Sequence, residues 1–245
     1  MSSNKKTFWT ETLPDPLPAN PLEIAAQWLI QAQREAAQPN PNSMILATVD
    51  ARGYPSARVV LCKEIAAQQG FILFYTNYRS RKGSELVHNP RAAVVFHWDH
   101  LHRQVRAEGK VELLSDAEND AYFRSRGWQK QLGAWASQQS QPVASRDVLV
   151  AAVAREARRF GIPYQGPGSA EPEHISTPVP RPPNWGGYRL WIDAVELWVE
   201  GEYRIHDRAR WTRTLAPLPG GTGGPSGPAS PDSPADAWTA TRLQP

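Results

Sequence analysis

Alternating apolar and polar positions are clearest over residues 103–114. One set of side chains is apolar or small: Val105, Ala107, Gly109, Val111 and Leu113. The intervening set is polar: Gln104, Arg106, Glu108, Lys110 and Glu112. Because successive strand residues point to opposite faces, this alternation predicts a strand with one face in the core and the other facing water or a partner.

Shorter apolar runs bounded by turn residues predict the remaining strands. Residues 44–49 and 56–63 form a predicted hairpin around a turn at 50–53. Further strands are predicted at residues 71–77, 92–98, 187–193, 195–199 and 203–211, the last two joined by a short turn at Glu200 and Gly201. In the last of these strands, the two-residue period would put four side chains on one face: Arg204, His206, Arg208 and Arg210.

Helix-capping signals lie between these strands. Asn20 and Pro21 begin a helix that is predicted to run to about residue 37. Ser80 caps a short helix, and Ser115 with Glu118 forms a capping box for a helix through residue 124. A short helix is expected around residues 132–136. Ser145 caps a longer one, whose predicted apolar face contains Val148, Leu149, Ala152, Val153 and Phe160.

Paired consecutive strands interrupted by helices favour a mainly β fold, an antiparallel barrel of Greek-key type with added helices. The sequence has no Gly-x-Gly-x-x-Gly motif, which argues against a Rossmann fold. We expect an extended N-terminal arm over residues 1–19 and a barrel domain over 20–215, with an irregular proline-rich insertion at 162–184. Residues 216–236 are mostly Pro, Gly, Ser, Ala and Asp and predict a disordered linker, after which 237–245 would dock back.

The overall charge is nearly balanced, with 27 Lys and Arg against 24 Asp and Glu in 245 residues. Recognition of an anion would therefore have to be local, and nucleic-acid binding gains little support. Cys62 is the single cysteine, which excludes an intrachain disulfide and a cysteine zinc site. We expect no metal. The sequence has no apolar run long enough to cross a bilayer and no signal peptide, so we expect a soluble cytoplasmic protein without a membrane partner.

The helix predicted after Ser80 begins with cations instead of the acidic residues that a helix N-terminus favours. Arg79, Arg81 and Lys82 would repel one another unless an anion lay among them, and the free backbone N–H groups there suit a phosphate. The alternative is a solvated basic turn. The stripe from Arg204 to Arg210 would suffer the same repulsion and also indicates an anion.

Together, the basic and polar clusters resemble those of the pyridoxamine 5′-phosphate oxidase family, flavoproteins of the split-barrel fold that bind FMN at a homodimer interface. The likeness runs from about residue 20 to 211 and resumes in the closing segment. Its markers, in order, are residues 58–63, Tyr75-Thr76, Ser80-Arg81-Lys82, 103–105, 131–135, Gln139-Ser140, 185–187 and 204–208.

The resemblance implies the residue roles. FMN contacts would come from Arg58, Val59, Val60, Leu61, Cys62, Lys63, Tyr75, Thr76, Arg81, Lys82, Gln104, Gln139, Ser140, Trp185 and Arg208. Substrate contacts would come from Lys63, Tyr122, Arg126, Lys130, Arg204 and His206. Arg204 and His206 would orient and polarise the reacting end of the substrate.

The reaction that the resemblance implies is oxidation of the 4′ carbon of pyridoxamine or pyridoxine 5′-phosphate. Hydride would pass to the flavin, and O2 would re-oxidise the flavin, releasing H2O2 and pyridoxal 5′-phosphate. The protein would position the donor carbon over the flavin. Two phosphates, one on the cofactor and one on the substrate, need two cationic pockets, and the chain has more than one basic cluster.

Two departures from the family pattern concern the substrate. Lys130 stands where the family usually has a serine that helps to hold the substrate phosphate, and the Arg and Tyr of the family's N-terminal arm have no match in residues 5–20. A second hypothesis is therefore an FMN barrel that oxidises a different amine or aromatic compound. A third, from another class, is a basic barrel that binds single-stranded nucleic acid, which predicts a colourless protein and salt-dependent binding.

Overall fold

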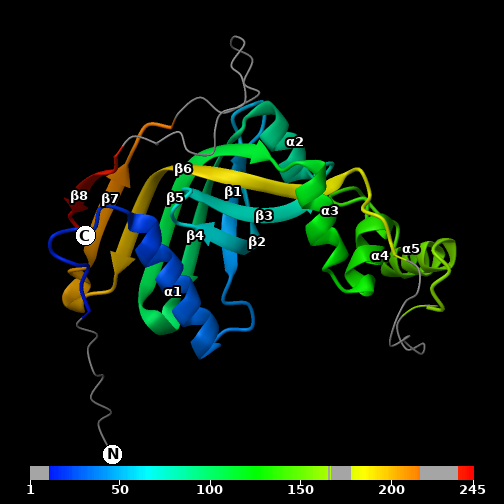
Figure 1. Ribbon diagram of the computed structural model, residues 1–245, viewed down its shortest axis with the longest axis horizontal. Helices are drawn as coiled ribbons and strands as arrows, with labels where there is room; N and C mark the ends of the chain where they lie inside the picture. Colours follow the sequence, from blue (N-terminus) through cyan, green and yellow to red (C-terminus); the bar gives the residue numbers. More distant parts are fainter. Residues whose placement is uncertain (1–10, 165, 167–177, 216–236) are drawn as a thin grey trace, which may run out of the picture. The chain divides into compact units, whose positions relative to one another are not determined.

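A computed structural model of the chain describes residues 11–164, 166, 178–215 and 237–245. Strands predominate, and helices are inserted between them (Figure 1). The elements are α1 (Pro21–Glu35), β1 (Ser43–Val49), β2 (Pro55–Ala66), β3 (Phe71–Asn77), α2 (Arg81–His88), β4 (Arg91–Trp98), β5 (Arg103–Leu113), α3 (Asp116–Arg124), α4 (Trp128–Ala136), α5 (Arg146–Arg159), β6 (Trp185–Val199), β7 (Asp207–Thr212) and β8 (Thr239–Leu243). The expected 216–236 linker, and parts of the expected arm and of the 162–184 insertion, lie outside the described residues.

The chain divides into two compact units. The barrel unit comprises Met1–Phe74, Asn89–Glu112 and Arg189–Pro245, and the helical unit comprises Tyr75–His88 and Leu113–Tyr188. The barrel unit holds nearly all of the strand residues together with α1. The helical unit holds α2 to α5 and the residues at one end of β3 and of β6.

The barrel is closed and antiparallel, as predicted. Its strand order is β3-β2-β1-β4-β5-β6, and a further pairing of β3 with β6 closes the ring. At that closure the Ile192 N–H donates to the Gly70 carbonyl at 3.0 Å. Beyond β6 the sheet continues into β7 and β8, so the C-terminal segment pairs with β7. Four large aromatic rings of the barrel unit are fully buried, those of Phe74, Phe96, Trp98 and Trp211.

Local sequence patterns predicted several helices and strands correctly. Asn20 caps α1, its side chain accepting from the Leu22 N–H at 3.1 Å, and the capping box of Ser115 with Glu118 begins α3. The polar and apolar faces of β5 also alternate in burial as predicted, except that Leu113 is 56% exposed. Residues 187–199 were predicted as two strands, whereas β6 is continuous from Trp185.

The predicted strand over residues 203–211 is wrong in its first half. Tyr203 and Arg204 adopt left-handed backbone angles, with φ of 54° and 66°, and the strand begins only at Asp207. A side chain at Gly201 would lie 1.8 Å from the Ile205 carbonyl oxygen, so the chain can make this tight turn only with glycine there. Arg204 and His206 therefore lie in a turn and do not share a strand face with Arg208 and Arg210.

In the helical unit, α3, α4 and α5 pack around a common core (Figure 1). That core includes Phe123 from α3, Leu132 from α4, Ala157 from α5 and Trp185 from the start of β6. The predicted apolar face of α5 is only partly correct. Val148 and Leu149 are exposed, and the small side chains of Ala152, Ala154 and Ala157 are the apolar groups buried along α5.

Candidate functional site

The structure distributes the predicted site residues over both units. The helical unit carries Tyr75, Thr76, Arg81, Lys82, Tyr122, Arg126, Lys130, Gln139, Ser140 and Trp185. The barrel unit carries Arg58, Val59, Val60, Leu61, Cys62, Lys63, Gln104, Arg204, His206 and Arg208.

Lys82 is the centre of a buried polar cluster in the helical unit. Its side chain is only 7% exposed, and Nζ donates to Thr76 Oγ1 at 3.1 Å, Ser80 Oγ at 3.1 Å and Gln139 Oε1 at 2.8 Å. Ser80 also caps α2, because its Oγ accepts from the Gly83 N–H at 3.3 Å. The cluster therefore places a buried ammonium group, two hydroxyls and an amide at the N-terminus of a helix that has no acidic residue in its first turn.

This donor set fits a phosphate monoester such as that of FMN. The N–H groups at the start of α2 and the helix dipole favour a negative charge, and Lys82 adds a fixed positive charge in a water-poor position. The segment after α4 completes the cluster, where Gln139 is followed by Ser140 with a left-handed φ of 72°. A non-glycine residue held in this conformation is a feature that often accompanies a binding site.

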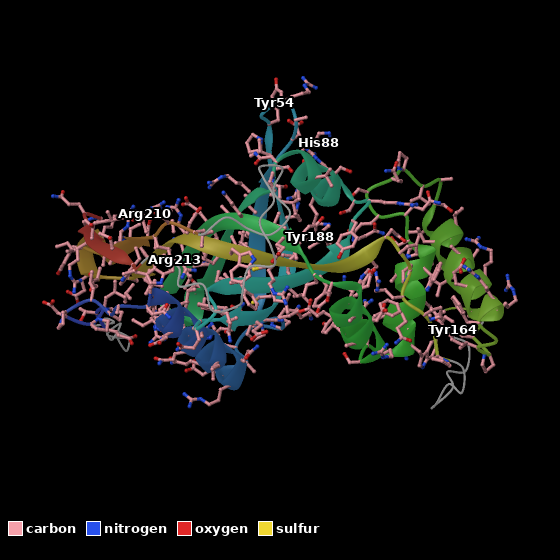
Figure 2. The ribbon with its side chains drawn as sticks, turned by 45° about the horizontal axis from the view of Figure 1, so that its top comes forward. Tyr54, His88, Tyr164, Tyr188, Arg210 and Arg213 are labelled. Atoms are coloured by element: carbon pink, nitrogen blue, oxygen red, sulfur yellow. The ribbon has the colours of Figure 1, made fainter. Side chains whose placement is uncertain are left out.

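Arg81 differs from its neighbour Lys82. Its side chain is 61% exposed, and its Nε donates to Glu85 at 2.9 Å. In the barrel unit Arg208 contacts Glu196 at 2.8 Å, and Arg210 (labelled in Figure 2) contacts Glu108 at 3.0 Å. Carboxylates of the protein thus offset the repulsion among these cations, so that repulsion alone does not require a bound anion. The cofactor roles of Arg81 and Arg208 stay predictions.

Three nearly parallel aromatic rings lie together in the helical unit. Tyr75 stacks on Tyr122 with ring centroids 3.9 Å apart and on Trp185 at 5.2 Å, and the interplanar angles are 13° and 10°. The guanidinium carbon of Arg126 lies 4.6 Å from the centroid of the Trp185 ring. Arg126 Nη1 is buried and has no hydrogen-bond partner among the described residues. Burial lowers the pKa of Arg126 from its ordinary value, an effect that Tyr122 partly opposes.

A buried hydrogen-bond network fixes the elements that carry these rings. Asn119 of α3 donates from Nδ2 to the Tyr78 hydroxyl at 3.2 Å and accepts at Oδ1 from the Gly187 N–H at 2.8 Å. The Tyr78 hydroxyl donates in turn to the Gly187 carbonyl at 3.2 Å, and its ring meets that of Tyr188 (labelled in Figure 2) edge-on. Burial raises the pKa of Tyr78, so the hydroxyl stays protonated and remains a donor.

In the barrel unit, the predicted residues of β2 differ in orientation. Val59 and Leu61 are exposed, Cys62 is buried, and Arg58 donates to the Leu46 carbonyl at 3.2 Å and to Thr48 Oγ1. Lys63 lies in a β-bulge, where the register with β3 shifts between Cys62 and Glu64. A bulge redirects the side chain of its extra residue, so Lys63 is not constrained to the regular alternation of the strand.

Cys62 offers a direct test of the placement of β2. Its side chain is 1% exposed, and burial raises the pKa of the thiol to about 12. At pH 8 only about one thiol in ten thousand would be ionised, and the thiolate is the reactive form. We expect Cys62 to resist alkylation by iodoacetamide in the folded protein and to react fully after denaturation, as measured by mass spectrometry. Rapid labelling of the folded protein would contradict this placement.

The turn that precedes β7 carries Arg204 and His206, and His206 lies beside Trp198, a residue that the sequence analysis missed. The Trp198 ring lies 4.7 Å from the His206 ring, and Trp198 pairs across the ladder with Arg208. The Gly201 N–H donates to His206 Nδ1 at 3.2 Å, which fixes the imidazole ring. The two-residue period of β6, together with its register with β7, would have indicated that Trp198 lies near this turn. Gln104 lies on β5 opposite His97 of β4.

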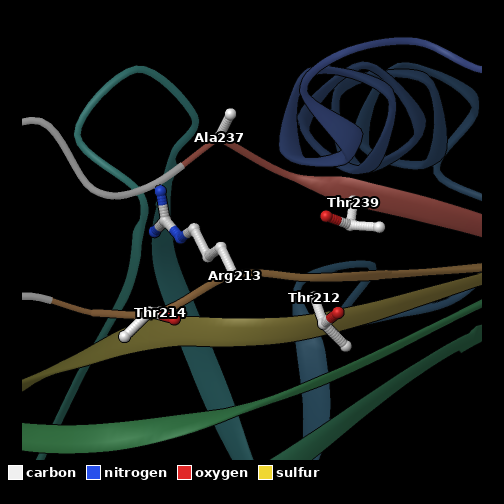
Figure 3. Close-up of a pocket in the computed structure, with 5 residues that line it drawn as sticks. All are labelled: Thr212, Arg213, Thr214, Ala237 and Thr239. Carbon is white, nitrogen blue, oxygen red and sulfur yellow. The ribbon is translucent and has the colours of Figure 1, made fainter.

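A pocket of about 420 Å³ in the barrel unit contains none of the predicted site residues (Figure 3). It is lined by Thr212, Arg213, Thr214, Ala237 and Thr239. Arg213 donates to the Ile192 carbonyl at 2.8 Å and to the Gly70 carbonyl at 3.0 Å, and its guanidinium lies 4.3 Å from the centre of the Trp238 ring. These contacts link the C-terminal segment to the barrel, so we assign Arg213 a structural role.

No helix in the described part of the chain is both long and apolar enough to span a membrane.

The family model described as pyridoxamine 5′-phosphate oxidase matches residues 30–158. A second model, described as the pyridoxine 5′-phosphate oxidase C-terminal dimerisation region, matches residues 185–245. With the closed barrel, these matches define an FMN-dependent oxidoreductase of the split-barrel class.

Curated relatives agree over most of the chain. A pyridoxine/pyridoxamine 5′-phosphate oxidase from Methylibium petroleiphilum is 50% identical over 195 residues, which cover 80% of this chain and 83% of that protein. One from Rhodopseudomonas palustris is 44% identical over 227 residues, 92% of this chain and 90% of that protein. The chain belongs to the pyridoxamine 5′-phosphate oxidase family.

Solved structures support the same fold. PhzG from Burkholderia lata, solved in complex with tetrahydrophenazine-1-carboxylic acid, is 27% identical with a TM-score of 0.73 and matches 94% of this chain and 95% of its own. A pyridoxamine 5′-phosphate oxidase-related, FMN binding protein from Nostoc punctiforme has a TM-score of 0.63 at 15% identity, over 94% of this chain and 100% of its own. At this identity the second likeness concerns the fold alone.

Proposed function

We propose that the chain oxidises pyridoxamine 5′-phosphate and pyridoxine 5′-phosphate to pyridoxal 5′-phosphate, with FMN as cofactor, O2 as electron acceptor and H2O2 as second product. The observation that carries this proposal is the presence of two separate cations in the helical unit, the buried Lys82 and the half-buried Arg126, whose Nη1 atom is itself buried. Lys82 lies in a hydroxyl-rich cluster at a helix start, and Arg126 has an unpaired Nη1 beside aromatic rings. A reaction with a phosphate on the cofactor and a phosphate on the substrate needs two such sites.

FMN, when bound, supplies the two-electron acceptor for the oxidation and the group that O2 re-oxidises. In this proposal Lys82, Arg81, Thr76 and the start of α2 bind its phosphate. The remaining predicted contacts bind the rest of the cofactor: Arg58 to Lys63, Tyr75, Gln104, Gln139, Ser140 and Arg208. We infer a homodimer in which both chains contribute to each FMN site, and the match of residues 185–245 to a dimerisation region supports it.

The substrate is positioned by a different group of side chains in this proposal. Arg126, Tyr122, Lys130 and Lys63 bind its phosphate and ring, while Arg204 and His206 orient the carbon that loses hydride. The hydrogen bond from the Gly201 N–H to His206 Nδ1 holds the imidazole ring before substrate arrives. Such preorganisation lowers the entropic cost of reaching a reactive geometry.

The decisive experiment is an oxidase assay on the purified yellow protein. We expect pyridoxal 5′-phosphate to form from pyridoxamine 5′-phosphate only in the presence of O2, with one H2O2 per product. The same assay with pyridoxine 5′-phosphate determines the preference between amine and alcohol. A protein that binds FMN but turns over neither compound would refute the proposed substrate while leaving the flavin assignment intact.

A second candidate is an FMN-dependent oxidase for a different amine or aromatic substrate. The likeness to PhzG, whose structure holds tetrahydrophenazine-1-carboxylic acid, favours it, as does Lys130 in place of the usual serine. Lys130 is exposed in the first turn of α4, so its charge is accessible to a ligand.

Lys130 distinguishes the two candidates. If it binds the phosphate of a vitamin B6 substrate as a point charge, Lys130→Ser should lower kcat/KM for pyridoxamine 5′-phosphate by about threefold to tenfold. Lys130→Arg, which keeps the charge, is the control and should have the smaller effect. A gain in turnover after Lys130→Ser would instead identify Lys130 as an adaptation to another substrate. Steady-state kinetics on the three proteins decide between these results.

A further inference from the structure

We propose that Asn119 is a positioning residue for the cofactor and substrate contacts of the helical unit, acting through the backbone at Gly187. Its side-chain amide joins α3 to the first residues of β6 and so sets where the rings of Tyr122 and Trp185 lie. The inference rests on the proposed function, in which Tyr122 contacts the substrate, and on the family resemblance, which assigns Trp185 to FMN.

The Asn119 amide takes the place of a hydrogen bond between two strands. Strands β5 and β6 are neighbours in the sheet, and just beyond the end of β5 the Leu114 N–H donates to the Gly187 carbonyl at 3.1 Å. Two residues bonded in this way in an antiparallel ladder normally exchange a second bond in return. Here the Gly187 N–H donates to Asn119 Oδ1 at 2.8 Å, and Asn119 Nδ2 donates to the Leu114 carbonyl at 3.1 Å. The amide thus lies between the two backbones and completes the exchange.

An amide is the group that suits this position. The N–H of Gly187 needs an acceptor and the carbonyl of Leu114 needs a donor, and Asn119 supplies both from one planar group. The same nitrogen also donates to the Tyr78 hydroxyl at 3.2 Å. Because Asn119 is only 1% exposed, water does not readily replace these bonds when the side chain is changed.

The aromatic rings of the unit depend on where Gly187 lies. A side chain at this position would come within 2.9 Å of the Tyr75 ring, so that ring packs directly against the backbone. Trp185 lies two residues before Gly187 and stacks on Tyr75, and Tyr122 follows Asn119 by about one turn of α3 and also stacks on Tyr75. A shift of the backbone at Gly187 would therefore move a predicted cofactor contact relative to a predicted substrate contact.

Tyr78 ties the segment that leads to Lys82 to the same part of β6. Its backbone N–H donates to the Asn184 carbonyl at 2.7 Å, and its hydroxyl donates to the Gly187 carbonyl at 3.2 Å while accepting from Asn119. Tyr78 stands four residues before Lys82 in the chain. One buried amide therefore supports the segments that carry the Lys82 cluster and the stacked rings.

The test replaces Asn119 with leucine, which is close in volume but has no polar atom in its side chain. The Gly187 N–H and the Leu114 carbonyl are then buried without partners, which favours separation of the two backbones. Near-UV circular dichroism of the apoprotein should change, because the stacked rings change their relative orientation. We expect the dissociation constant of FMN to rise by about tenfold. In the holoenzyme kcat for pyridoxamine 5′-phosphate should fall by on the order of 30-fold, while KM changes by less than about threefold.

Asn20 provides a matched control. Its side chain likewise accepts from a backbone N–H, that of Leu22 at 3.1 Å, and donates to a carbonyl, that of Ala67 at 2.9 Å, but it lies at the start of α1 in the barrel unit. Asn20→Leu should lower the thermal unfolding temperature and leave FMN affinity and kcat within about twofold of the wild type. Equal losses of affinity and kcat in both variants would mean that any loss of stability impairs the site, and the proposal would be overturned.

Tyr78→Phe separates the two hydrogen bonds of the amide nitrogen. It removes the hydroxyl but keeps the bridge from Gly187 through Asn119 to Leu114, so FMN affinity should fall by no more than about threefold. An effect as large as that of Asn119→Leu would assign the positioning to the hydroxyl and refute the role of the bridge.

Two further results bear on the proposal. If Asn119→Leu lowered only the unfolding temperature, with unchanged circular dichroism, FMN affinity and kcat, Asn119 would be a structural residue and the inference would be wrong. If Asn119→Leu failed to fold, Asn119→Ser, which also removes the bridge, would be measured against the same expectations. Should the wild-type enzyme turn over no vitamin B6 compound, the proposed function would fail, yet the FMN affinity and circular dichroism of the variants would still decide the role of Asn119.

Discussion

Replacing Lys82 with methionine is expected to raise the dissociation constant of FMN by on the order of 100-fold. Methionine keeps most of the volume of the side chain but removes the buried ammonium that contacts Thr76, Ser80 and Gln139. A phosphate bound at the start of α2 would then lose a charge-assisted bond in a position where water cannot replace it fully. Fluorescence titration of the apoprotein with FMN measures the change.

Arg81→Ala is the matched control for Lys82→Met. Arg81 adjoins Lys82 in the sequence, but it is largely exposed and already paired with Glu85, so we expect about a threefold loss of FMN affinity or less. Thermal unfolding of both apoproteins separates lost binding from lost stability. Equal losses of affinity in the two variants would show that burial does not distinguish these cations, and the assignment of Lys82 as the main phosphate ligand would be wrong.

The second large effect is expected for Arg126→Ala. If the unpaired Nη1 of Arg126 binds the substrate phosphate, kcat/KM for pyridoxamine 5′-phosphate should fall by on the order of 100-fold. The much lower activity with pyridoxamine, which lacks the phosphate, should change by only about twofold. The FMN spectrum and affinity should be those of the wild type, because Arg126 is assigned to the substrate.

Arg124→Ala provides the comparison for Arg126→Ala. Arg124 is an exposed cation at the end of α3, two residues before Arg126, and its loss removes the same formal charge. We expect kcat/KM to change little in this variant. A similar fall in both variants would mean that long-range attraction of the anionic substrate, not a specific contact at Arg126, accounts for the effect.

The fold was predictable where the determining interactions are local. Capping residues such as Asn20 and Ser115 form hydrogen bonds within three positions in the chain, and the alternation along β5 follows directly from strand geometry. The turn before β7 could not be predicted in this way. Tyr and Arg rarely adopt left-handed angles, and only Gly201 indicated that Tyr203 and Arg204 would do so.

The residues of the candidate site could be predicted from the sequence, but most of the ion pairs that they form could not. The sequence predicted Lys82 at a helix start and Gln139 in a separate segment. Only the family resemblance indicated that both belong to one site, and the structure shows them in contact. The carboxylates that neutralise Arg208 and Arg210 come from β6 and β5, so their pairing depends on strand register. Glu85 was the exception, because a residue four positions after Arg81 on a helix is a predictable partner.

The Glu196 carboxylate lies between two arginines of neighbouring strands, Arg106 at 3.3 Å and Arg208 at 2.8 Å. Much of the positive charge on the barrel is therefore already compensated in the polypeptide itself. Folding of the chain and binding of FMN can therefore occur in separate steps, because the arginines do not need the bound cofactor to offset their mutual repulsion.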